Sequence, residues 1–333
     1  MRQQIESALT VVGAVVGAGF ASGREVYHFF SRYGANGLLG VVVAMAVLCL
    51  LCMRVLALAE QYRAKTLAEL MQMHLGVRVN NLLSRVLLGV LWLGLGIMLS
   101  GAAAAGESLG INKIVTLVVT SILIAACLYS GIAGIKKANA LLIPILIAVS
   151  SYLFWCGMEH GSYSFLIVDT SVLSWAGSVW SAILYAGLNS LLVFVVIPPL
   201  AIEDKPTGVL LGCALFAVML LGTTVLLLQF PVLSAESPVP ILSIIADIAP
   251  RMPEIYGVIL WTALTTTALA NGLGMQTFVE TRLQLNRFSA SVLVVASSLP
   301  VALLPFTKLV AIAYTGLGYV ALVLAVAMLK PSR

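Results

Sequence analysis

Apolar runs of about 20 residues, separated by short polar segments, fill most of this 333-residue chain and restrict it to one class of fold. Lipid offers the backbone no hydrogen-bond partner, so each run satisfies its own N–H and C=O groups by forming a helix. A membrane β-barrel would instead alternate apolar and polar residues in runs of about 10 residues. Composition agrees, since 61% of the residues are hydrophobic and only 9% are charged. The sequence therefore predicts an all-α integral membrane protein.

We expect ten transmembrane helices within a single transmembrane domain that covers residues 1–333. The apolar runs lie near residues 6–32, 36–57, 82–109, 112–132, 138–158, 174–201, 207–230, 255–280, 288–305 and 309–329. An even number of spans places both termini on one side of the membrane, and the positive-inside rule selects that side. A cytoplasmic N-terminus leaves 13 of the 18 basic residues inside: Arg2, Arg54, Arg63, Lys65, Arg78, Arg85, Lys136, Lys137, Lys205, Arg282, Arg287, Lys330 and Arg333. We therefore predict a multi-pass plasma (cytoplasmic) membrane protein with both termini in the cytoplasm.

The sequence carries no signature of an enzyme or of a nucleic-acid-binding protein. It has no phosphate-binding loop linked to a lysine, no H-E-x-x-H and no G-x-S-x-G motif. The net charge of +5 follows from the membrane topology and from contact with lipid, so it does not indicate nucleic acid as a partner. The five cysteines are interpreted as small buried hydrophobic residues. We expect no enzymatic activity and no organic cofactor.

The first span contains a glycine-rich interruption, from Gly13 to Gly23, that ends in Arg24 and Glu25. Glycine lets the backbone leave helical geometry at little cost, which frees carbonyls to bind a cation and amides to bind a carboxylate. Freed groups are costly against lipid, so such a break must face protein or water. The alternative is close helix packing of the G-x-x-x-G type, which Gly13 and Gly17 match. Ionisable groups at this depth favour a functional break.

A second interruption is predicted in the sixth span, at residues 185–190, with two prolines at the inner end of that span. Each half of the chain, approximately 5–158 and 171–330, then holds five spans and begins with an interrupted one. An odd number of spans per repeat requires the two halves to be inverted relative to each other. Paired broken helices in inverted halves are typical of transporters with a binding site near the membrane midplane.

Two polar segments are long enough to form structure of their own. Residues 58–81 are basic and amphipathic, which predicts a cytoplasmic helix lying along the bilayer surface. Residues 231–254 carry five prolines around a short amphipathic stretch on the outer face. This outer segment is either an extracellular lid or a passive connector.

The run Val16-Gly17-Ala18-Gly19-Phe20-Ala21-Ser22-Gly23-Arg24-Glu25, with Gly34 and Gly37 following, resembles the opening of the YkvI-type membrane proteins. The resemblance extends over the whole chain. That family in turn is similar to the amino acid/polyamine/organocation (APC) superfamily, whose members share the LeuT-like fold. The resemblance therefore implies a five-plus-five inverted repeat in which helices 1 and 6 are broken.

The superfamily resemblance also implies a sodium site. Its sodium-coupled members hold the ion between carbonyls of the first-span break and an A-x-x-T/S-T/S motif in the eighth span, which residues 263–267 match. The implied ligands are the carbonyls of Gly13, Val16 and Ala263 and the hydroxyls of Thr266 and Thr267. Five such oxygens suit a monovalent hard cation. The alternative is that these threonines bond only to their own helix, one turn back.

For the substrate, the resemblance implies a small zwitterion or amine. Its carboxylate would rest on backbone amides of the first-span break, those of Gly17, Ala18 and Gly19. Tyr185 and Asn189 in the sixth span would close the pocket. Phe20 is assigned a stacking or gating face, and the alternative for these aromatic residues is packing alone.

Glu25 is open to several roles. It forms an outer ion-pair gate with Arg24, binds the ammonium group of a substrate, or carries a proton. The structural alternative is a salt-bridged pair with Arg24 at the vestibule. His28 lies close to the break and is a candidate proton relay. Arg24, Glu25 and His28 are therefore the predicted gate or coupling residues.

Together these features predict a secondary active transporter of a small organic solute, an amino acid or related amine, coupled to sodium and working by alternating access. Spans 1, 2, 6 and 7 would rock against spans 3, 4, 8 and 9, as the resemblance implies. One alternative is a proton-coupled or uncoupled exchanger of the same fold. The other is a non-transporting membrane sensor or partner-binding protein. The expected partners are a small-molecule substrate and the lipid bilayer, and the oligomeric state stays open.

Overall fold

The computed structural model describes residues 2–130, 172–203 and 206–330, together with 144–145, 148–149, 151–152 and 155. Within these residues every regular element is a helix. The first half contains α1 (Arg2–Val15), α2 (Ala18–Ser22), α3 (Arg24–Phe29), η1 (Ser31–Tyr33), α4 (Asn36–Tyr62), α5 (Leu67–Leu75), α6 (Val77–Ser108) and α7 (Lys113–Ser130). The second half contains α9 (Val172–Glu203), α10 (Pro206–Gln229), α11 (Pro231–Glu236), α12 (Pro240–Ile248), α13 (Pro253–Leu283), α14 (Arg287–Ala302), α15 (Phe306–Leu309), η3 (Val310–Tyr314) and α16 (Thr315–Met328). The predicted all-α class is confirmed.

Seven helices of the described residues are long and apolar enough to cross a membrane. They are Asn36–Tyr62, Arg85–Ser108, Lys113–Ser130, Ser174–Ala201, Pro206–Gln229, Pro253–Glu280 and Phe306–Met328. Two shorter apolar helices, Gln4–Val15 and Arg287–Ala302, correspond to parts of the predicted first and ninth spans. Most of the predicted fifth span, 138–158, lies outside the described residues, so the number of ten spans stays a prediction.

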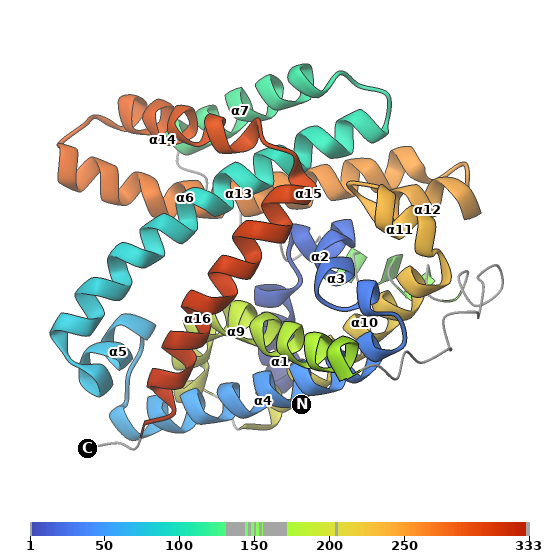
Figure 1. Ribbon diagram of the computed structural model, residues 1–333. Coiled ribbons are helices and arrows are strands. Elements are labelled where there is room, and N and C mark those ends of the chain that lie inside the picture. Colours follow the sequence, from blue (N-terminus) through green and yellow to red (C-terminus); the bar gives the residue numbers. More distant parts are fainter. Residues whose placement is uncertain are drawn as a thin grey trace.

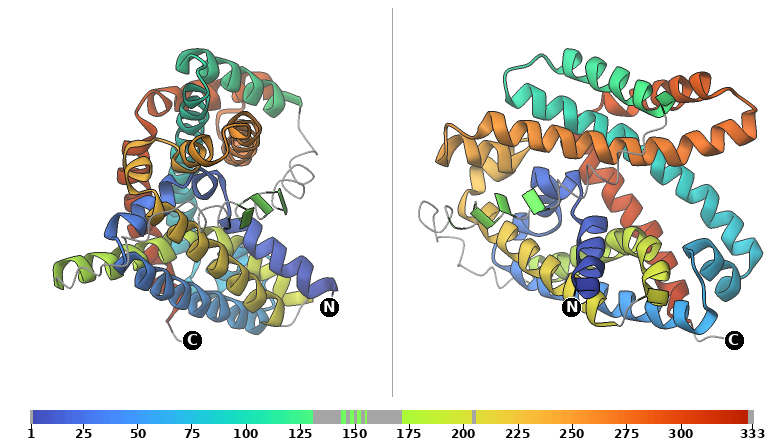
Figure 2. Two further views of the ribbon diagram at one scale, coloured as in Figure 1. Left: turned by 90° about the vertical axis from the view of Figure 1, so that its right-hand side faces the viewer. Right: turned by 180° about the vertical axis from the view of Figure 1, so that it is seen from behind.

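The helices pack in two groups, with the short helices that follow the break in the first span between them (Figure 1). One group joins α4 to α9 and α10, and α1 to α9 and α10. The other joins α6 to α7, α13 and α14. Helix α16 packs mainly on α9, while α2 contacts α13 of the second group. The right-hand view of Figure 2 shows α1 rising from the N-terminus towards α13. The chain after the break therefore lies where the two groups meet.

The first span is broken at the place that its glycines predict. Helix α1 ends at Val15, and Gly17 is extended, with φ −97° and ψ −173°, before α2 begins at Ala18. A second interruption follows at Gly23, whose φ of 77° lies in the left-handed region that glycine adopts without steric cost. Three short helical pieces therefore replace one continuous transmembrane helix.

The break predicted in the sixth span is wrong, because α9 continues as one helix from Val172 to Glu203. The polar side chains that indicated a break bond to the helix itself: Asn189 Nδ2 donates to Tyr185 O at 3.0 Å, and Ser190 Oγ donates to Gly187 O at 2.7 Å. Gly187 serves packing instead, since a Cβ there would lie 3.1 Å from Gly318 O of α16. The glycine permits close contact between two helices rather than a change of backbone geometry.

The polar segments fold into short helices. The helix expected over residues 58–81 is shorter, because α4 runs on to Tyr62 and α6 begins at Val77, leaving only α5 between them. Thr66 caps α5 by accepting a hydrogen bond from Glu69 N at 3.2 Å, and Glu69 Oε2 accepts one from Lys65 N at 2.8 Å. The outer segment 231–254 forms α11 and α12, each beginning with a proline.

The contact between α9 and α16 can be tested with two glycines of α16. A Cβ at Gly318 would lie 2.9 Å from the backbone oxygen of Leu184, whereas Gly316 has no such neighbour within 4 Å. We expect Gly318→Ala to destabilise the protein by about 1–3 kcal/mol through overpacking. Gly316→Ala should leave stability unchanged or raise it slightly, because alanine favours a helix. Thermal unfolding of the purified protein in detergent measures both, and equal midpoints would contradict the packing role of Gly318.

Candidate functional site

The break in the first span releases backbone carbonyls. Gly17 N donates to Val15 O at 2.9 Å and Val16 N donates to Val12 O at 2.7 Å, so neither amide reaches Gly13. In the described part of the chain, no backbone amide donates to the carbonyl oxygen of Gly13 or to that of Val16. Both oxygens belong to the predicted sodium ligands. The backbone geometry at the break thus leaves these two carbonyls available to a cation.

The eighth-span motif places three oxygens together on one face of α13. Thr266 Oγ1 and Thr267 Oγ1 both donate to Ala263 O, at 3.0 and 2.9 Å. The threonines thus bond to their own helix one turn back, as the alternative to a sodium site predicts. Each hydroxyl oxygen nevertheless keeps lone pairs that a cation can use. Helix α13 packs on α2, directly after the break. Whether the three oxygens share an ion with Gly13 and Val16 stays a prediction.

Glu25 points back into the protein, towards the first-span break. Only 7% of its surface is exposed. A Cβ added to Gly19 would collide with Glu25 Oε2 and would lie 3.0 Å from Tyr314 Oη, so both oxygens converge on the space beside Gly19. The side chains of Tyr185 and Asn189, from α9, also lie within reach of this carboxyl group. Four elements, α2, α3, α9 and η3, therefore meet at the Glu25 carboxyl group.

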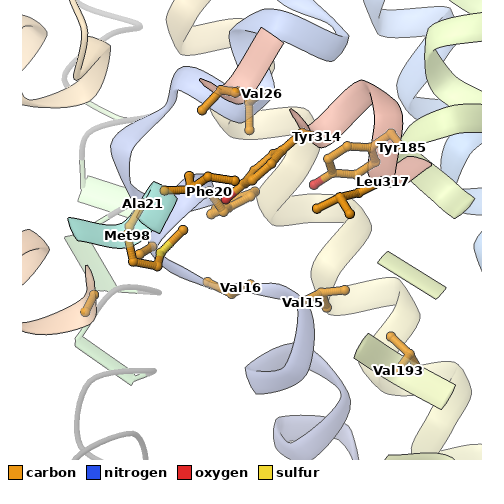
Figure 3. Packing of buried hydrophobic residues seen from close by; sticks show 14 of the residues in the cluster. Val15, Val16, Phe20, Ala21, Val26, Met98, Tyr185, Val193, Tyr314 and Leu317 are labelled. Carbon is orange, nitrogen blue, oxygen red and sulfur yellow. The ribbon is translucent and has the colours of Figure 1, made fainter. Parts of the chain in front are cut away.

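Tyr185 is enclosed by aromatic rings. Its ring centroid lies 4.8 Å from that of Phe30, 5.3 Å from that of Phe29 and 6.5 Å from that of Phe216. Phe20 joins this cluster through Phe216, at 5.8 Å. The Tyr185 hydroxyl is buried and has no partner with hydrogen-bonding geometry among the described residues. Figure 3 shows Tyr185 beside Tyr314, with both hydroxyl groups directed towards the side on which Phe20 lies.

Arg24 does not pair with Glu25, and the expected ion pair between them is not formed. Arg24 Nη1 instead donates to the carbonyl oxygens of Ser234, Ala235 and Ser237, at 3.3, 3.0 and 3.3 Å. Its guanidinium group also lies over the ring of Tyr27, 5.0 Å from the centroid. The two neighbouring side chains diverge because successive residues of α3 point in different directions around the helix. Arg24 therefore ties α3 to the outer segment.

The outer segment packs directly on the broken span. Helix α12 contacts α2, and a Cβ at Gly23 would lie 2.7 Å from Ile241 Cγ1. Ile241, Leu242, Ile244 and Ile245 are all buried. The segment is therefore a packed cover over the first span at Gly23. Its opening and closing, which a lid requires, stays a prediction.

His28 contacts α16 and its own segment. Its Nε2 lies 3.0 Å from Thr315 Oγ1 of α16, and its Nδ1 lies 3.4 Å from Arg32 Nη1. The described contacts do not connect it to Glu25. Its predicted role as a proton relay has no support from these contacts and stays a prediction.

Two tyrosines at the site were missed by the sequence analysis. Tyr314 belongs to η3, a π-helical turn of the kind often found at functional sites, and its hydroxyl lies beside Gly19. Tyr256 of α13 donates from its hydroxyl to Ala21 O at 2.6 Å, which fixes the end of α2. Nothing in the sequence distinguishes either residue from an aromatic side chain that serves packing alone.

No protein-family model matches the chain. It is 26% identical to the uncharacterised membrane protein YkvI of Bacillus subtilis (strain 168) over 337 aligned residues, which cover 97% of this chain and 94% of YkvI. The predicted resemblance to YkvI is confirmed. The uncharacterised protein YyaD of the same organism is 21% identical over 332 residues, covering 96% of this chain and 94% of YyaD.

Solved structures show which fold the chain adopts. The inward-facing conformation of Mhp1 matches with a TM-score of 0.64 at 14% identity, over 95% of this chain and 72% of Mhp1. An Eremococcus coleocola manganese transporter, in complex with an aromatic bis-isothiourea substituted compound, matches with a TM-score of 0.61 at 15% identity, over 98% of this chain and 78% of the transporter. MhsT in complex with L-phenylalanine matches with a TM-score of 0.60 at 16% identity, over 96% of this chain and 87% of MhsT. All three are LeuT-fold proteins, so this chain has a LeuT-like fold.

The hydrogen bond from Tyr256 to Ala21 gives a direct test of how the broken span is held. We expect Tyr256→Phe to cost about 1–2 kcal/mol, because it removes a buried donor and leaves a carbonyl without its partner. Tyr319→Phe is the matched control, since Tyr319 is 47% exposed and accepts its bond from Trp180 near the surface. Thermal unfolding in detergent compares the two variants. An equal loss in both would contradict a special role for Tyr256.

Proposed function

We propose that this protein is a secondary active transporter of a small organic solute, an amino acid or a related amine. The observation that carries the proposal is the broken first span, with its two free carbonyls and the buried Glu25, placed between two helix groups of a LeuT-like fold. Unpaired backbone groups and a buried carboxyl group are costly within a membrane and persist where a ligand uses them.

The architecture supports alternating access. One packed group contains the first, second, sixth and seventh predicted spans, and the other contains the third, fourth, eighth and ninth. We propose that these groups rock against each other around the break, within ten spans arranged as an inverted repeat, and that both termini lie in the cytoplasm beneath the plasma membrane. Because α9 is continuous, the broken backbone of the proposed site comes from the first span.

Sodium is the proposed coupling ion. Two observations support this proposal: the carbonyls of Gly13 and Val16 accept no backbone hydrogen bond among the described residues, and the oxygens of Ala263, Thr266 and Thr267 lie together on α13. Neutral carbonyl and hydroxyl oxygens favour a monovalent hard cation over zinc or copper. In the part of the chain that the structure describes, no group of three His, Cys, Asp or Glu side chains is placed to hold a metal ion.

The buried Glu25 favours one alternative, a transporter of the same fold that couples to protons. A carboxyl group enclosed by neutral side chains is a proton-binding group in many membrane proteins. Ion-dependent unfolding and uptake into proteoliposomes distinguish sodium coupling from proton coupling. Uptake also distinguishes a transporter from the sensor alternative.

The sodium site is tested by ion-dependent stability. We expect sodium, compared with equal potassium, to raise the unfolding temperature of the wild-type protein, because an ion that binds only the folded state stabilises it. Thr266→Ala and Thr267→Ala should each abolish most of this increase. Thr262→Ala is the matched control, since Thr262 makes the same kind of bond, to Val258 O at 2.7 Å, one turn earlier.

Two outcomes would count against sodium: an unchanged sodium response in the Thr266 and Thr267 variants, or no response in the wild type. Loss of the response in Thr262→Ala as well would indicate general damage to α13 rather than removal of ligands.

Transport itself is tested in proteoliposomes with a mixture of labelled amino acids and amines. We expect an inward sodium gradient to drive accumulation above equilibrium, because the ion and the solute move together. Accumulation under a proton gradient alone would favour the proton-coupled alternative. Folded protein that moves no solute under either gradient would favour the sensor alternative.

A further inference from the structure

Glu25 is a buried carboxyl group without a counter-ion among the described residues. The basic side chains of its own segment are directed elsewhere, Arg24 to the carbonyls of the outer segment and His28 to Thr315. The side chains that face it from other elements are Tyr185, Asn189 and Tyr314, which are neutral partners. An ionised carboxylate in such a place is costly unless a cation pairs with it. The environment therefore favours either a proton bound to Glu25 or a ligand cation beside it.

The carboxyl group also occupies the place where a substrate carboxylate was expected. Glu25 Oε2 lies against Gly19, so close that a Cβ on this glycine would collide with it. The backbone amides of Gly17 to Gly19 were the predicted cradle for the carboxylate of a zwitterion. Two carboxylates side by side repel each other strongly at low dielectric. A ligand that enters here gains most if it is positive and brings no carboxylate of its own.

Aromatic rings supply the remaining chemistry for such a ligand. Tyr185 and Phe216 stack nearly parallel, 15° apart, with centroids separated by 6.5 Å, and Phe20 lies 5.8 Å from Phe216. Ring faces attract organic ammonium groups, most strongly where water is excluded. The Tyr185 hydroxyl is buried beside the Glu25 carboxyl group, and its oxygen carries lone pairs that can accept a hydrogen bond from an ammonium N–H.

We propose that Glu25, Tyr185 and the aromatic cluster around them bind the ammonium group of an organic amine that lacks a carboxylate. Glu25 supplies the negative charge, the rings of Tyr185, Phe216 and Phe20 cover the alkyl part, and the Tyr185 hydroxyl accepts a hydrogen bond. This inference rests on the proposed transport function and narrows its substrate from amino acids and amines to amines.

Inorganic ions fit this environment less well. A sodium ion needs several oxygen ligands, whereas aromatic rings surround Tyr185. A proton needs no aromatic enclosure. The combination of a single carboxylate with ring faces matches an organic cation best.

The test uses three sets of ligands, matched in their apolar part and different in charge. They are ethylamine, L-alanine and propionate; isoamylamine, L-leucine and 4-methylpentanoate; and phenethylamine, L-phenylalanine and 3-phenylpropionate. Calorimetric titration of the purified full-length protein measures their affinities at neutral pH. In the set whose size fits the site, we expect the amine to bind at least tenfold more tightly than the zwitterion, and the carboxylate not to bind.

Three variants test whether the preference for amines arises at Glu25 and Tyr185. Glu25→Gln keeps the shape and should weaken binding of the preferred amine at least tenfold. Tyr185→Phe keeps the ring and should weaken binding of the preferred amine several-fold. If Glu25→Gln does not fold, Tyr185→Phe alone provides the test. Glu107→Gln makes the same change at an exposed carboxyl group on α6 and should leave the affinity unchanged.

Tighter binding of the zwitterion, or amine affinity that is unchanged in Glu25→Gln and Tyr185→Phe, would overturn this inference and leave the transport proposal standing. Glu25→Gln that keeps amine affinity but loses proton-driven uptake would identify Glu25 as a proton site and also overturn it. If none of the nine compounds binds while the broader labelled mixture is transported, the inference alone fails. If no solute of either set binds or is transported, the proposed function fails with it.

Discussion

The broken backbone at Val16 and Gly17 is the constraint on which the rest of this structure depends. Its free carbonyls cannot face lipid, because lipid has no donor to offer them. They are placed between two groups of packed helices instead, with α1 on one group and α2 against the other. The hydrogen bond from Tyr256 to Ala21 holds the short α2 in place. Without these tertiary supports, three short helical pieces would not replace one transmembrane helix.

Gly19 and η3 shape the space around Glu25. The missing side chain of Gly19 makes room for a carboxyl oxygen, and the π-helical turn brings Tyr314 to the same point. Helix α9 contributes Tyr185 and Asn189 from the opposite side. A carboxyl group from the first span is therefore enclosed by side chains that are far away in the sequence. Ionisable groups buried in this way within a membrane protein are usually functional.

The segment 231–254 is tied to this centre through the first span. Arg24 donates to three of its carbonyls, while α12 lies on Gly23 and buries its apolar side chains. Movement of α3 would therefore have to break or carry these contacts. The adjacent Arg24 and Glu25 thus belong to different interactions, one with the cover and one with the centre, although their proximity in the sequence suggested an ion pair.

The sequence by itself determined the membrane class, the helical content and the break in the first span, because apolar length and glycine spacing are local properties that act through backbone hydrogen bonding. It also supplied the resemblance to YkvI and the oxygen cluster of Ala263, Thr266 and Thr267. Only the tertiary structure decided that α9 stays continuous, since Gly187 meets Gly318 across a helix contact. The direction of Glu25 and the roles of Tyr256 and Tyr314 likewise depend on which helices pack together, and no local pattern encodes such long-range contacts.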